Sequence, residues 1–580
     1  MRFRILLPVF LFALAVPAVH TQSSQPEKTA PDLPPDVKAF QDAGKIADPA
    51  EKIAALEKFK KDFPNSNMLA GADRGILSTL AEKMPDQTAR MQRFAKTMLG
   101  GARDKKEKAS LQAEIADIYL TNKILLQDAE KYAKASVDGI NQRKFIADLT
   151  AQYAKQQASA KASTGPTNAK AGNAPANGPK PPTDRELITR FYHVRAARLA
   201  TLGRIEFERG NMAEAVKTLN EAHAEDRDQP GAQATLGEIA LRKGEYSQAL
   251  DYLVAARLAG QSGPSTIAAL STAYSKTHND SAAGLDAMLD AEYRKRFPEP
   301  LHLDPYKPSA KRRDRLVLAE VFTGAGCPPC VGADLAFDAA MERYSRKDLA
   351  VVMYHQHVPR PDPMANSDTE ARLKYYDVHG VPTYFIDGGG VKFNGASRDG
   401  AKSVWEHIQE PIEKELDSPA EARIAVNTSV SGNSVKVTAS VEGVKSESKD
   451  LKVHVLLLER ELTYSGENGI RFHPMVVRAM GGKDDNGFAL DPAAPASVEQ
   501  TWDLDQIAAG LKKQLDDYEA KGHRGSPFQF IEKKYQIDRG NLAVVVFVQD
   551  SKTKHVLDAA YVDLNPSAPH IPTSSSGGGR

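Results

Sequence analysis

Apolar residues recur at helical spacing through residues 36–155. In the stretch ADPAEKIAALEKFKKDFPNS, Ile53, Leu56 and Phe59 are three residues apart, and a proline follows the last of them closely. Asp48 precedes the run at the position of a helix N-cap, with a proline next to it at the first turn. The pattern predicts that residues 36–155 form a helical domain.

Large apolar residues are missing from the next segment, residues 156–184. It is rich in Ala, Pro, Gly, Lys and Asn and contains no aromatic or large aliphatic residue. Such a composition cannot bury enough apolar surface to offset the entropy of ordering the chain. We therefore expect a disordered linker here.

Helical periodicity returns in residues 185–298 as an internal repeat. ATLGRIEFERGNMAEAVKTLNEAHAEDRDQP aligns with ATLGEIALRKGEYSQALDYLVAARLAGQSGP at a period of 34 residues. The positions that match include Leu202 and Leu236, Gly203 and Gly237, Gly210 and Gly244, Ala215 and Ala249, Leu219 and Leu253, and Pro230 and Pro264. The period resembles the tetratricopeptide repeat, whose stacked helix pairs usually bind a peptide or protein, with an architectural spacer as the alternative.

Strand and helix patterns alternate in residues 299–415. RLVLAEVF reads as a strand, VGADLAFDAAMERYS as a helix and LAVVMYH as a second strand, and a short helix and further strand residues follow. This alternation predicts an α/β domain with helices on the faces of its sheet.

The pattern changes to strict alternation after about residue 416. Val435, Val437, Ala439 and Val441 point to one side of a predicted strand, and polar residues separate them. Further strands follow, with a helical insertion around residues 504–518. Residues 416–566 are therefore predicted to form an antiparallel β-sandwich-like domain.

The two ends of the chain differ in composition from these domains. Residues 1–18 combine an arginine-bearing start, a short apolar run and small residues before Ala18, which is the pattern of a cleaved signal peptide. Residues 567–580 form a Ser- and Gly-rich tail that we expect to be disordered. We expect an exported protein that is periplasmic, outer-membrane-associated or secreted, with no membrane span in the mature chain.

Charge limits the class of partner. Charged residues make up 26% of the chain and balance to a net charge of +1. This balance gives no electrostatic basis for binding nucleic acid, so none is expected as a partner.

The chain has 2 cysteines, and they stand together in the motif Cys-Pro-Pro-Cys. An exported chain with so few cysteines is not a disulfide scaffold, and two thiols alone do not complete a tetrahedral zinc site. The motif follows a predicted strand and opens a predicted helix, with Cys327 at the N-cap and Cys330 at the third helical position. A thiolate is favoured at a helix N-terminus, so Cys327 is predicted to attack disulfides and Cys330 to resolve the mixed disulfide.

These residues resemble the thioredoxin fold. Its motif combines a CxxC at a helix start with a cis-proline beside it, and GVPT supplies the proline as Pro382. The resemblance implies that the Val381–Pro382 bond is cis and that the Val381 backbone pairs with the substrate. EVFTGAGCPPC, DPMANSDTEARLKYYDVHGVPTYFIDG and GENGIRFHPMVVRAM are similar to the thioredoxin-like family related to a twenty-eight-kilodalton bacterial outer-membrane protein, over residues 315–560.

The chain departs from the thioredoxin pattern at two places. Gly326 stands where many thioredoxins carry a tryptophan, and Val321 stands where they carry a buried acid that moves a proton from the resolving thiol. Glu320 is one residue earlier and, in an alternating strand, points to the opposite face. The proton acceptor for Cys330 is therefore left open.

Several histidines offer other chemistry. His355 and His357 alternate at a strand end and, with the thiols, could bind copper or zinc; the alternative is a polar strand end beside a loop. His379 is interpreted as a surface residue, and Arg471 and His473 as residues of a domain interface. We predict no metal or cofactor site.

Three functional hypotheses remain. The leading one is an exported thiol–disulfide oxidoreductase whose helical repeats recruit a protein partner and whose substrates carry disulfides or thiols. The second is a non-catalytic interaction scaffold with a structural thioredoxin-like module, and the third is a metal carrier that uses the thiols. The direction of the redox chemistry, the substrate and the oligomeric state are not specified by the sequence.

Overall fold

The structure is a computed structural model of the chain. It describes residues 34–162, 182–261, 263–392, 395–482, 487–523 and 528–565. The predicted signal peptide at residues 1–18 and the predicted tail at residues 567–580 lie outside the described residues.

The first part of the chain is helical, as predicted. Its helices are α1 (Pro35–Lys45), α2 (Pro49–Asp62), α3 (Leu69–Lys83), α4 (Thr88–Gly100), α5 (Lys105–Thr121), α6 (Leu126–Asp138) and α7 (Gln142–Ala162). In α2 the Asp48 side chain accepts a hydrogen bond from the backbone N–H of Glu51 and caps the helix. Ile53, Leu56 and Phe59 are buried, so the predicted apolar stripe faces the helical core.

The predicted linker begins later than expected. Helix α7 continues to Ala162, so residues 156–162 are helical and not part of a linker. This run is rich in alanine and glutamine, which are strong helix formers. Residues 163–181 of the predicted linker lie outside the described residues.

The repeats form a second set of helices. These are α8 (Asp184–Glu208), α9 (Met212–Glu225), α10 (Pro230–Lys243), α11 (Tyr246–Leu258), α12 (Pro264–Thr277) and α13 (Leu285–Arg296). A Cβ on Gly203 would lie 2.6 Å from Leu219 Cγ, and one on Gly237 would lie 2.5 Å from Leu253 Cγ. The two positions that are 34 residues apart in the sequence therefore make the same helix–helix contact.

A mixed sheet forms the centre of the remaining chain. Among the described residues it has 9 strands, in the order β12-β11-β7-β8-β2-β1-β3-β4, with β9 beside β7. Strands β1 (Val317–Thr323) and β2 (Leu349–His355) are parallel, and β3 (Thr383–Ile386) runs antiparallel to β1. The other members are β4 (Gly389–Gly390), β7 (Leu451–Thr463), β8 (Phe472–Met480), β9 (Phe488–Ala489), β11 (Leu542–Asp550) and β12 (Val556–Asp563).

This sheet crosses the boundary predicted between residues 415 and 416. Strand β2 pairs with β8 in parallel, with Met353 opposite Val476, so strands from both predicted domains share one hydrogen-bonded sheet. The predicted boundary itself falls between α16 (Ala401–Leu416) and β5 (Arg423–Ser431). A long-range strand pairing of this kind leaves no local signal in the hydrophobic pattern.

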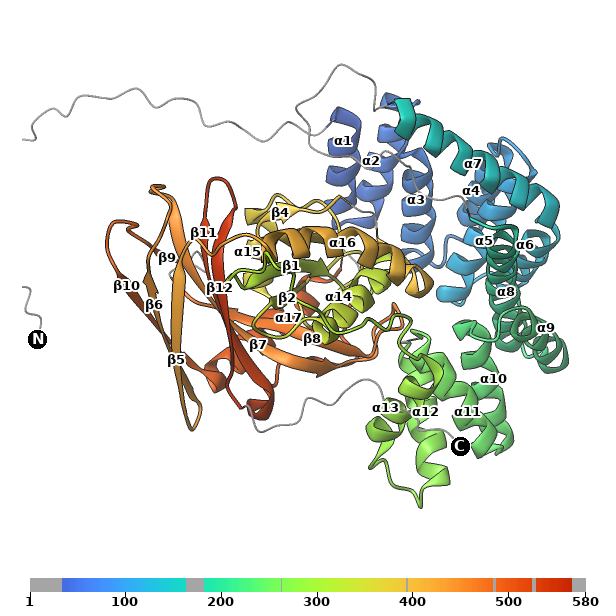
Figure 1. Cartoon of the computed structure of the whole chain (residues 1–580). Helices are drawn as coiled ribbons and strands as arrows, with labels where there is room; N and C mark the ends of the chain where they lie inside the picture. Colours follow the sequence, from blue (N-terminus) through green and yellow to red (C-terminus); the bar gives the residue numbers. More distant parts are fainter. Residues whose placement is uncertain are drawn as a thin grey trace, which may run out of the picture.

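Helices cover the sheet around β1. The core on one face joins α14 (Val331–Arg343) and α16 to strands β1, β2 and β3. Helix α15 (Ser367–Tyr375) lies against β2 and β8. Figure 1 shows these helices and the sheet on one side of the molecule, and the curved array of α1–α13 on the other.

A second, smaller sheet completes the β-rich region. It has the order β10-β6-β5, with β6 (Ser434–Glu442) between β5 and β10 (Ala496–Asp503). The alternating residues predicted to face one way are all buried in β6, and they pack against β7 and β11. The predicted helical insertion is α17 (Leu504–Lys521), capped by Asp503.

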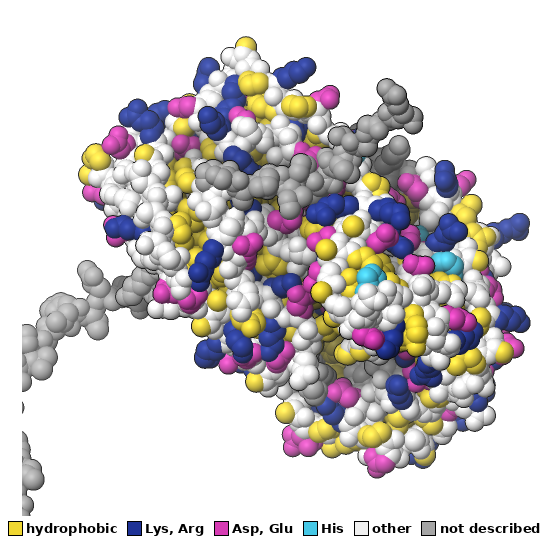
Figure 2. Space-filling model, turned by 90° about the horizontal axis from the view of Figure 1, so that it is seen from below, with side chains coloured by type: hydrophobic (Ala, Val, Ile, Leu, Met, Phe, Trp, Pro, Cys, Tyr) yellow, Lys and Arg dark blue, Asp and Glu magenta, His cyan; other side chains and the backbone are white. Residues whose placement is uncertain are grey.

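Figure 2 shows acidic and basic side chains interspersed over the face that it displays, without a large region of one sign. Within the described ranges, no helix is long and apolar enough to cross a membrane.

Candidate functional site

The Cys-Pro-Pro-Cys motif connects β1 to α14. Pro328–Cys330 form a single 3-10 turn, with the backbone N–H of Cys330 donating to the Cys327 carbonyl at 3.1 Å, and α14 begins at Val331. Cys327 therefore caps a 3-10 turn, and Cys330 takes the N-cap position of the α-helix that was predicted to start earlier. A first turn of this tighter type is common at helix starts.

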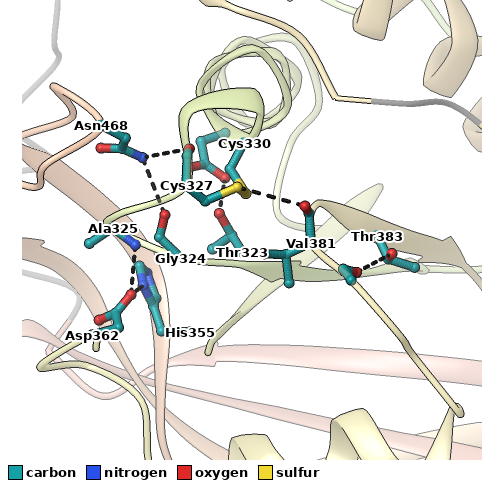
Figure 3. Close-up of a disulfide and its surroundings, with 12 residues drawn as sticks. Thr323, Gly324, Ala325, Cys327, Cys330, His355, Asp362, Val381, Thr383 and Asn468 are labelled. Atoms are coloured by element: carbon teal, nitrogen blue, oxygen red, sulfur yellow. Dashed lines mark hydrogen bonds and ion pairs between the residues drawn. A yellow bond between two sulfur atoms is a disulfide. The ribbon is translucent and has the colours of Figure 1, made fainter. Parts of the chain in front are cut away.

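The two cysteines are joined in a disulfide with a Cα–Cα distance of 5.3 Å. Cys327 Sγ lies 3.7 Å from the carbonyl oxygen of Val381, at the end of the loop that leads into β3 (Figure 3). The Val381–Pro382 bond is cis, as the resemblance implied. The structure therefore brings together all four predicted site residues, although Cys330 and Val381 are 51 positions apart in the sequence.

Both cysteines are buried in this oxidised state. Cys327 is 1% exposed and Cys330 is 0% exposed, whereas Pro328 and Pro329 between them are exposed. Cys327 is thus no more accessible than Cys330, and its position at the start of the turn is what distinguishes it. Exchange with a protein thiol requires a movement that uncovers the sulfurs.

The segment before α16 packs against the motif. The Ala396 carbonyl accepts a hydrogen bond of 2.7 Å from the backbone N–H of Gly332. A Cβ on Gly395 would lie 2.2 Å from the Pro329 carbonyl oxygen and 2.5 Å from Pro382 Cγ. Glycine is therefore required here because this backbone runs directly against both halves of the motif.

A buried aspartate holds the loop before Cys327. The Asp362 carboxylate accepts a hydrogen bond of 2.6 Å from the Ala325 N–H and lies 2.8 Å from His355 Nδ1 (Figure 3). Burial raises the pKa of Asp362, but His355 and the backbone donors outweigh it and lower the pKa to about 2. Asp362 is therefore ionised at neutral pH and acts as an anchor for the loop.

A second buried carboxyl lies at the start of α14. The Thr323 hydroxyl at the end of β1 donates a hydrogen bond of 2.7 Å to Asp334 Oδ1. Asp334 is 5% exposed, and burial raises its pKa to about 6 against the opposing effect of Thr323. Asp334 was not predicted from the sequence, although its place four residues after Cys330 on a predicted helix was a visible signal.

Glu320 faces away from this cluster, as the strand alternation predicted. Its carboxylate accepts hydrogen bonds of 2.8 Å from Arg372 and 2.9 Å from the Tyr354 hydroxyl, and a further one from the Tyr376 hydroxyl. Glu320 is thus committed to a buried ion pair with α15 and is not available to a cysteine.

Gly326, just before the first cysteine, has a steric reason to lack a side chain. A Cβ on Gly326 would lie 2.9 Å from Cβ of Arg360, because the loop after β2 passes over this position. The same loop contains a second cis bond, Val358–Pro359. Any larger residue at position 326 would displace that loop.

A loop between β7 and β8, residues 464–471, touches the motif from the other side. The Asn468 side chain donates to the carbonyls of Gly324 at 3.3 Å and Cys327 at 3.4 Å, and its backbone N–H donates to Ala325 at 2.9 Å (Figure 3). Neither Asn468 nor Asp362 was predicted from the sequence, because both come from loops distant from the motif.

The histidines near the motif have packing and hydrogen-bond partners within the protein. His357 accepts a hydrogen bond from the Asp362 N–H and packs on Tyr518, and His473 packs against the ring of His355. His379 is exposed, as predicted. Among the described residues there is no group of three or more His, Cys, Asp or Glu that could hold a metal ion.

The same loop, residues 464–471, also contacts the repeats. Arg257 of α11 donates a hydrogen bond of 2.7 Å to the Ser465 carbonyl, and Arg471 donates one of 2.6 Å to Asp290 of α13. A groove of about 370 Å³ opens beside these contacts. Its lining comes from the repeats, the loop after β2, and the segments around residues 464 and 530: Gly260, Gln261, Gly263, Pro264, Arg360, Pro361, Tyr464, Glu467, Phe528, Gln529, Phe530 and Ile531.

Comparison with known proteins identifies one part of the chain. Residues 206–274 match the family described as tetratricopeptide repeat, which confirms the repeat read from the sequence. No curated protein matches the chain. Among solved structures, the chain is similar to HBP35 of Porphyromonas gingivalis, with 16% identity and a TM-score of 0.31 over 47% of this chain and 82% of that one, a likeness too distant to carry an argument.

Proposed function

We propose that the protein is an exported thiol–disulfide oxidoreductase with a thioredoxin-like segment at residues 299–415 and tetratricopeptide-like repeats that recruit a protein partner. The observation that carries the proposal is the Cys327–Cys330 disulfide, set at the start of α14 with Cys327 Sγ 3.7 Å from the Val381 carbonyl. In the reduced protein, that carbonyl would accept a hydrogen bond from the Cys327 thiol or from a substrate backbone N–H.

The chemistry follows from the pair itself. The Cys327 thiolate attacks a substrate disulfide, one substrate thiolate leaves, and a mixed disulfide forms. The Cys330 thiolate then attacks Cys327 Sγ, the second substrate thiolate leaves, and the Cys327–Cys330 disulfide forms. Run in reverse, the same steps oxidise a substrate dithiol.

The repeats support recruitment of a protein partner. Tetratricopeptide repeats stack into extended surfaces that bind peptides or proteins. In this chain the repeats contact the loop of residues 464–471, which in turn contacts the Cys327 loop. A partner bound to the repeats would therefore be held on the same molecule as the disulfide, next to the loop that contacts Cys327.

A second candidate is the non-catalytic scaffold. The observation that favours it is the burial of both cysteines, with Cys327 1% exposed and Cys330 0% exposed. In that case the disulfide serves only as a local brace, and the repeats alone carry the function.

One experiment separates these functions. A Cys330→Ser variant should accumulate mixed disulfides with proteins from an exported fraction, because the resolving thiol is missing, whereas Cys327→Ser should not. In the reduced wild type, alkylation near neutral pH should modify Cys327 faster than Cys330, because the start of the turn favours its thiolate. The control is the double serine variant, which should trap nothing.

Two outcomes would contradict the proposal. Failure of Cys330→Ser to form any mixed disulfide, together with a Cys327–Cys330 disulfide that resists reduction in the folded protein, would favour the scaffold. Faster alkylation of Cys330 would reverse the roles of the two cysteines.

A further inference from the structure

The proton acceptor that the resolving cysteine needs is missing from its expected place. Val321 stands at that position, and the neighbouring Glu320 is bound to Arg372 and two tyrosines on the opposite face of the sheet. Yet Cys330 must lose a proton before it can attack, because the thiolate and not the thiol is the nucleophile. A buried thiol has no bulk water to accept that proton.

Asp334 lies one helical turn from Cys330. Cys330 is the N-cap of α14, and Asp334 is four residues later, so the two side chains share a face of the helix. Side chains on a helix lean toward its N-terminus, so we expect the Asp334 carboxyl to lie on the side of Cys330. Cβ atoms at this spacing are about 5–6 Å apart, a separation that a carboxyl and a thiol span directly or through one water.

The carboxyl is held in position from the neighbouring strand. Thr323 ends β1 four residues before Cys327, and its hydroxyl donates to Asp334 Oδ1 at 2.7 Å. This hydrogen bond links the strand that leads into the motif to the helix that leaves it. Both residues are buried, with Thr323 1% exposed and Asp334 5% exposed.

The charges around Asp334 suit a base near neutral pH. Burial raises its pKa to about 6, the Thr323 hydrogen bond and His355 of β2 oppose the rise, and Asp362 adds to it. Asp338 is the nearest acidic residue on α14 itself. Above pH 6 the carboxyl is mainly ionised and can accept a proton, and a pKa close to the working pH is favourable for a general base.

Asp362 is the other buried acid near the motif, and its contacts exclude it from this role. Its carboxylate is occupied by His355 and the Ala325 N–H, and these partners, acting against burial, lower its pKa to about 2. A carboxylate that is so weakly basic would hold a thiol proton poorly.

We propose that Asp334 accepts the proton of Cys330 when the mixed disulfide is resolved. This inference rests on the proposed exchange activity and adds a residue to it. The proton passes from Cys330 Sγ to the Asp334 carboxylate, the Cys330 thiolate bonds to Cys327 Sγ, and the bond between Cys327 and the substrate sulfur breaks. The departing substrate thiolate takes up a proton, from Asp334 or from water, so that protons and electrons balance.

The test is the resolution step in the full chain, measured against a model disulfide such as oxidised glutathione. In the wild type the rate at which the mixed disulfide resolves should rise with pH through a midpoint near 6, as Asp334 ionises. Asp334→Asn keeps the size and the oxygen that accepts from Thr323 but cannot accept the proton. It should slow resolution about 100-fold and abolish that midpoint, while formation of the mixed disulfide at Cys327 is retained.

A matched control lies on the same helix. Asp338 is one turn beyond Asp334 and further from Cys330, so Asp338→Asn should resolve the mixed disulfide at the wild-type rate with the midpoint unchanged. An equal loss of rate in both variants would mean a general effect on α14 and would overturn the proposal. So would a wild-type rate and pH profile in Asp334→Asn.

A second variant decides the matter if Asp334→Asn does not fold. Thr323→Val removes the donor that lowers the Asp334 pKa, so the midpoint should move to higher pH. A midpoint that does not move would refute the role of Asp334. Should the wild type form no mixed disulfide at all, the proposed function fails and the inference with it, whereas normal exchange with an unchanged Asp334→Asn profile overturns the inference alone.

Discussion

At the scale of single residues, glycines decide how closely the backbone packs around the disulfide. Gly326 admits the loop after β2, and Gly395 admits the segment that covers the motif. Each lies where a Cβ would meet another part of the chain at less than 3.0 Å. These positions have no chemistry of their own, yet they let two other segments pack directly against the motif and its neighbours.

We expect the segment at Gly395 to restrict access to the disulfide, and a substitution there tests this. In Gly395→Ala, the new Cβ would lie 2.2 Å from the Pro329 carbonyl oxygen, so the covering segment must move away. We expect the variant to lose about 1–3 kcal/mol of stability and its disulfide to be reduced faster by dithiothreitol. Gly380→Ala is the control, since its Cβ would meet no atom within 4 Å; similar reduction rates in both variants would show that residue 395 does not cover the disulfide.

At the scale of elements, the repeats depend on close helix pairs. Gly203 of α8 and Gly237 of α10 lie against leucines of the next helix, at distances that leave no room for a methyl group. The equivalence explains why the sequence repeats glycine at these positions, because each helix pair has the same spacing.

Gly203→Ala should therefore disrupt one helix pair. Its Cβ would lie 2.6 Å from Leu219 Cγ, and we expect a loss of about 1–3 kcal/mol in the unfolding free energy of the repeats. Gly510→Ala in α17 is the matched control, because that helical glycine has no atom within 4 Å of its Cβ and alanine favours a helix by about 1 kcal/mol. Thermal unfolding followed by circular dichroism measures both; equal stability of the two variants would contradict the packing argument.

At the scale of the whole molecule, the repeats and the sheet share buried contacts. Arg471 is 3% exposed and pairs with Asp290 of α13, and Tyr293 of α13 packs on Phe472 with ring centroids 5.5 Å apart. The interpretation of Arg471 as an interface residue is thus confirmed. These contacts reach the loop of residues 464–471, so the repeats and the Cys327 loop are connected through one segment.

The contacts of Arg471 predict that two neighbouring aspartates, Asp290 and Asp286, contribute unequally to stability. Asp290→Ala removes the 2.6 Å partner of a buried arginine and should destabilise the full chain by about 1.5–3 kcal/mol. Asp286→Ala should change stability by less than about 0.5 kcal/mol, because its 93% exposed side chain lies 3.5 Å from Arg471. Chemical denaturation of both variants checks this, and an equal effect would mean that Arg471 does not depend on Asp290.

Much of the architecture was determined by local sequence. The apolar stripe at Ile53, Leu56 and Phe59 required a helix with one buried face, and the alternation around Val435 and Val437 required a strand with one buried face. A 34-residue period required stacked helix pairs. The cysteine motif predicted a disulfide, since two thiols three positions apart at a helix start can bond to each other.

Tertiary structure alone decided the rest, because it depends on contacts between distant segments. The pairing of β2 with β8, the anchoring of the Cys327 loop by Asp362 and the packing of Gly395 against Pro329 and Pro382 join residues that have no common local pattern. Burial is also a property of the folded chain, so the raised pKa of Asp334 could not be read from its neighbours in the sequence. The sequence by itself determined which two cysteines can pair with each other; the fold determined which groups surround them, because desolvation and hydrogen bonding depend on distances in space.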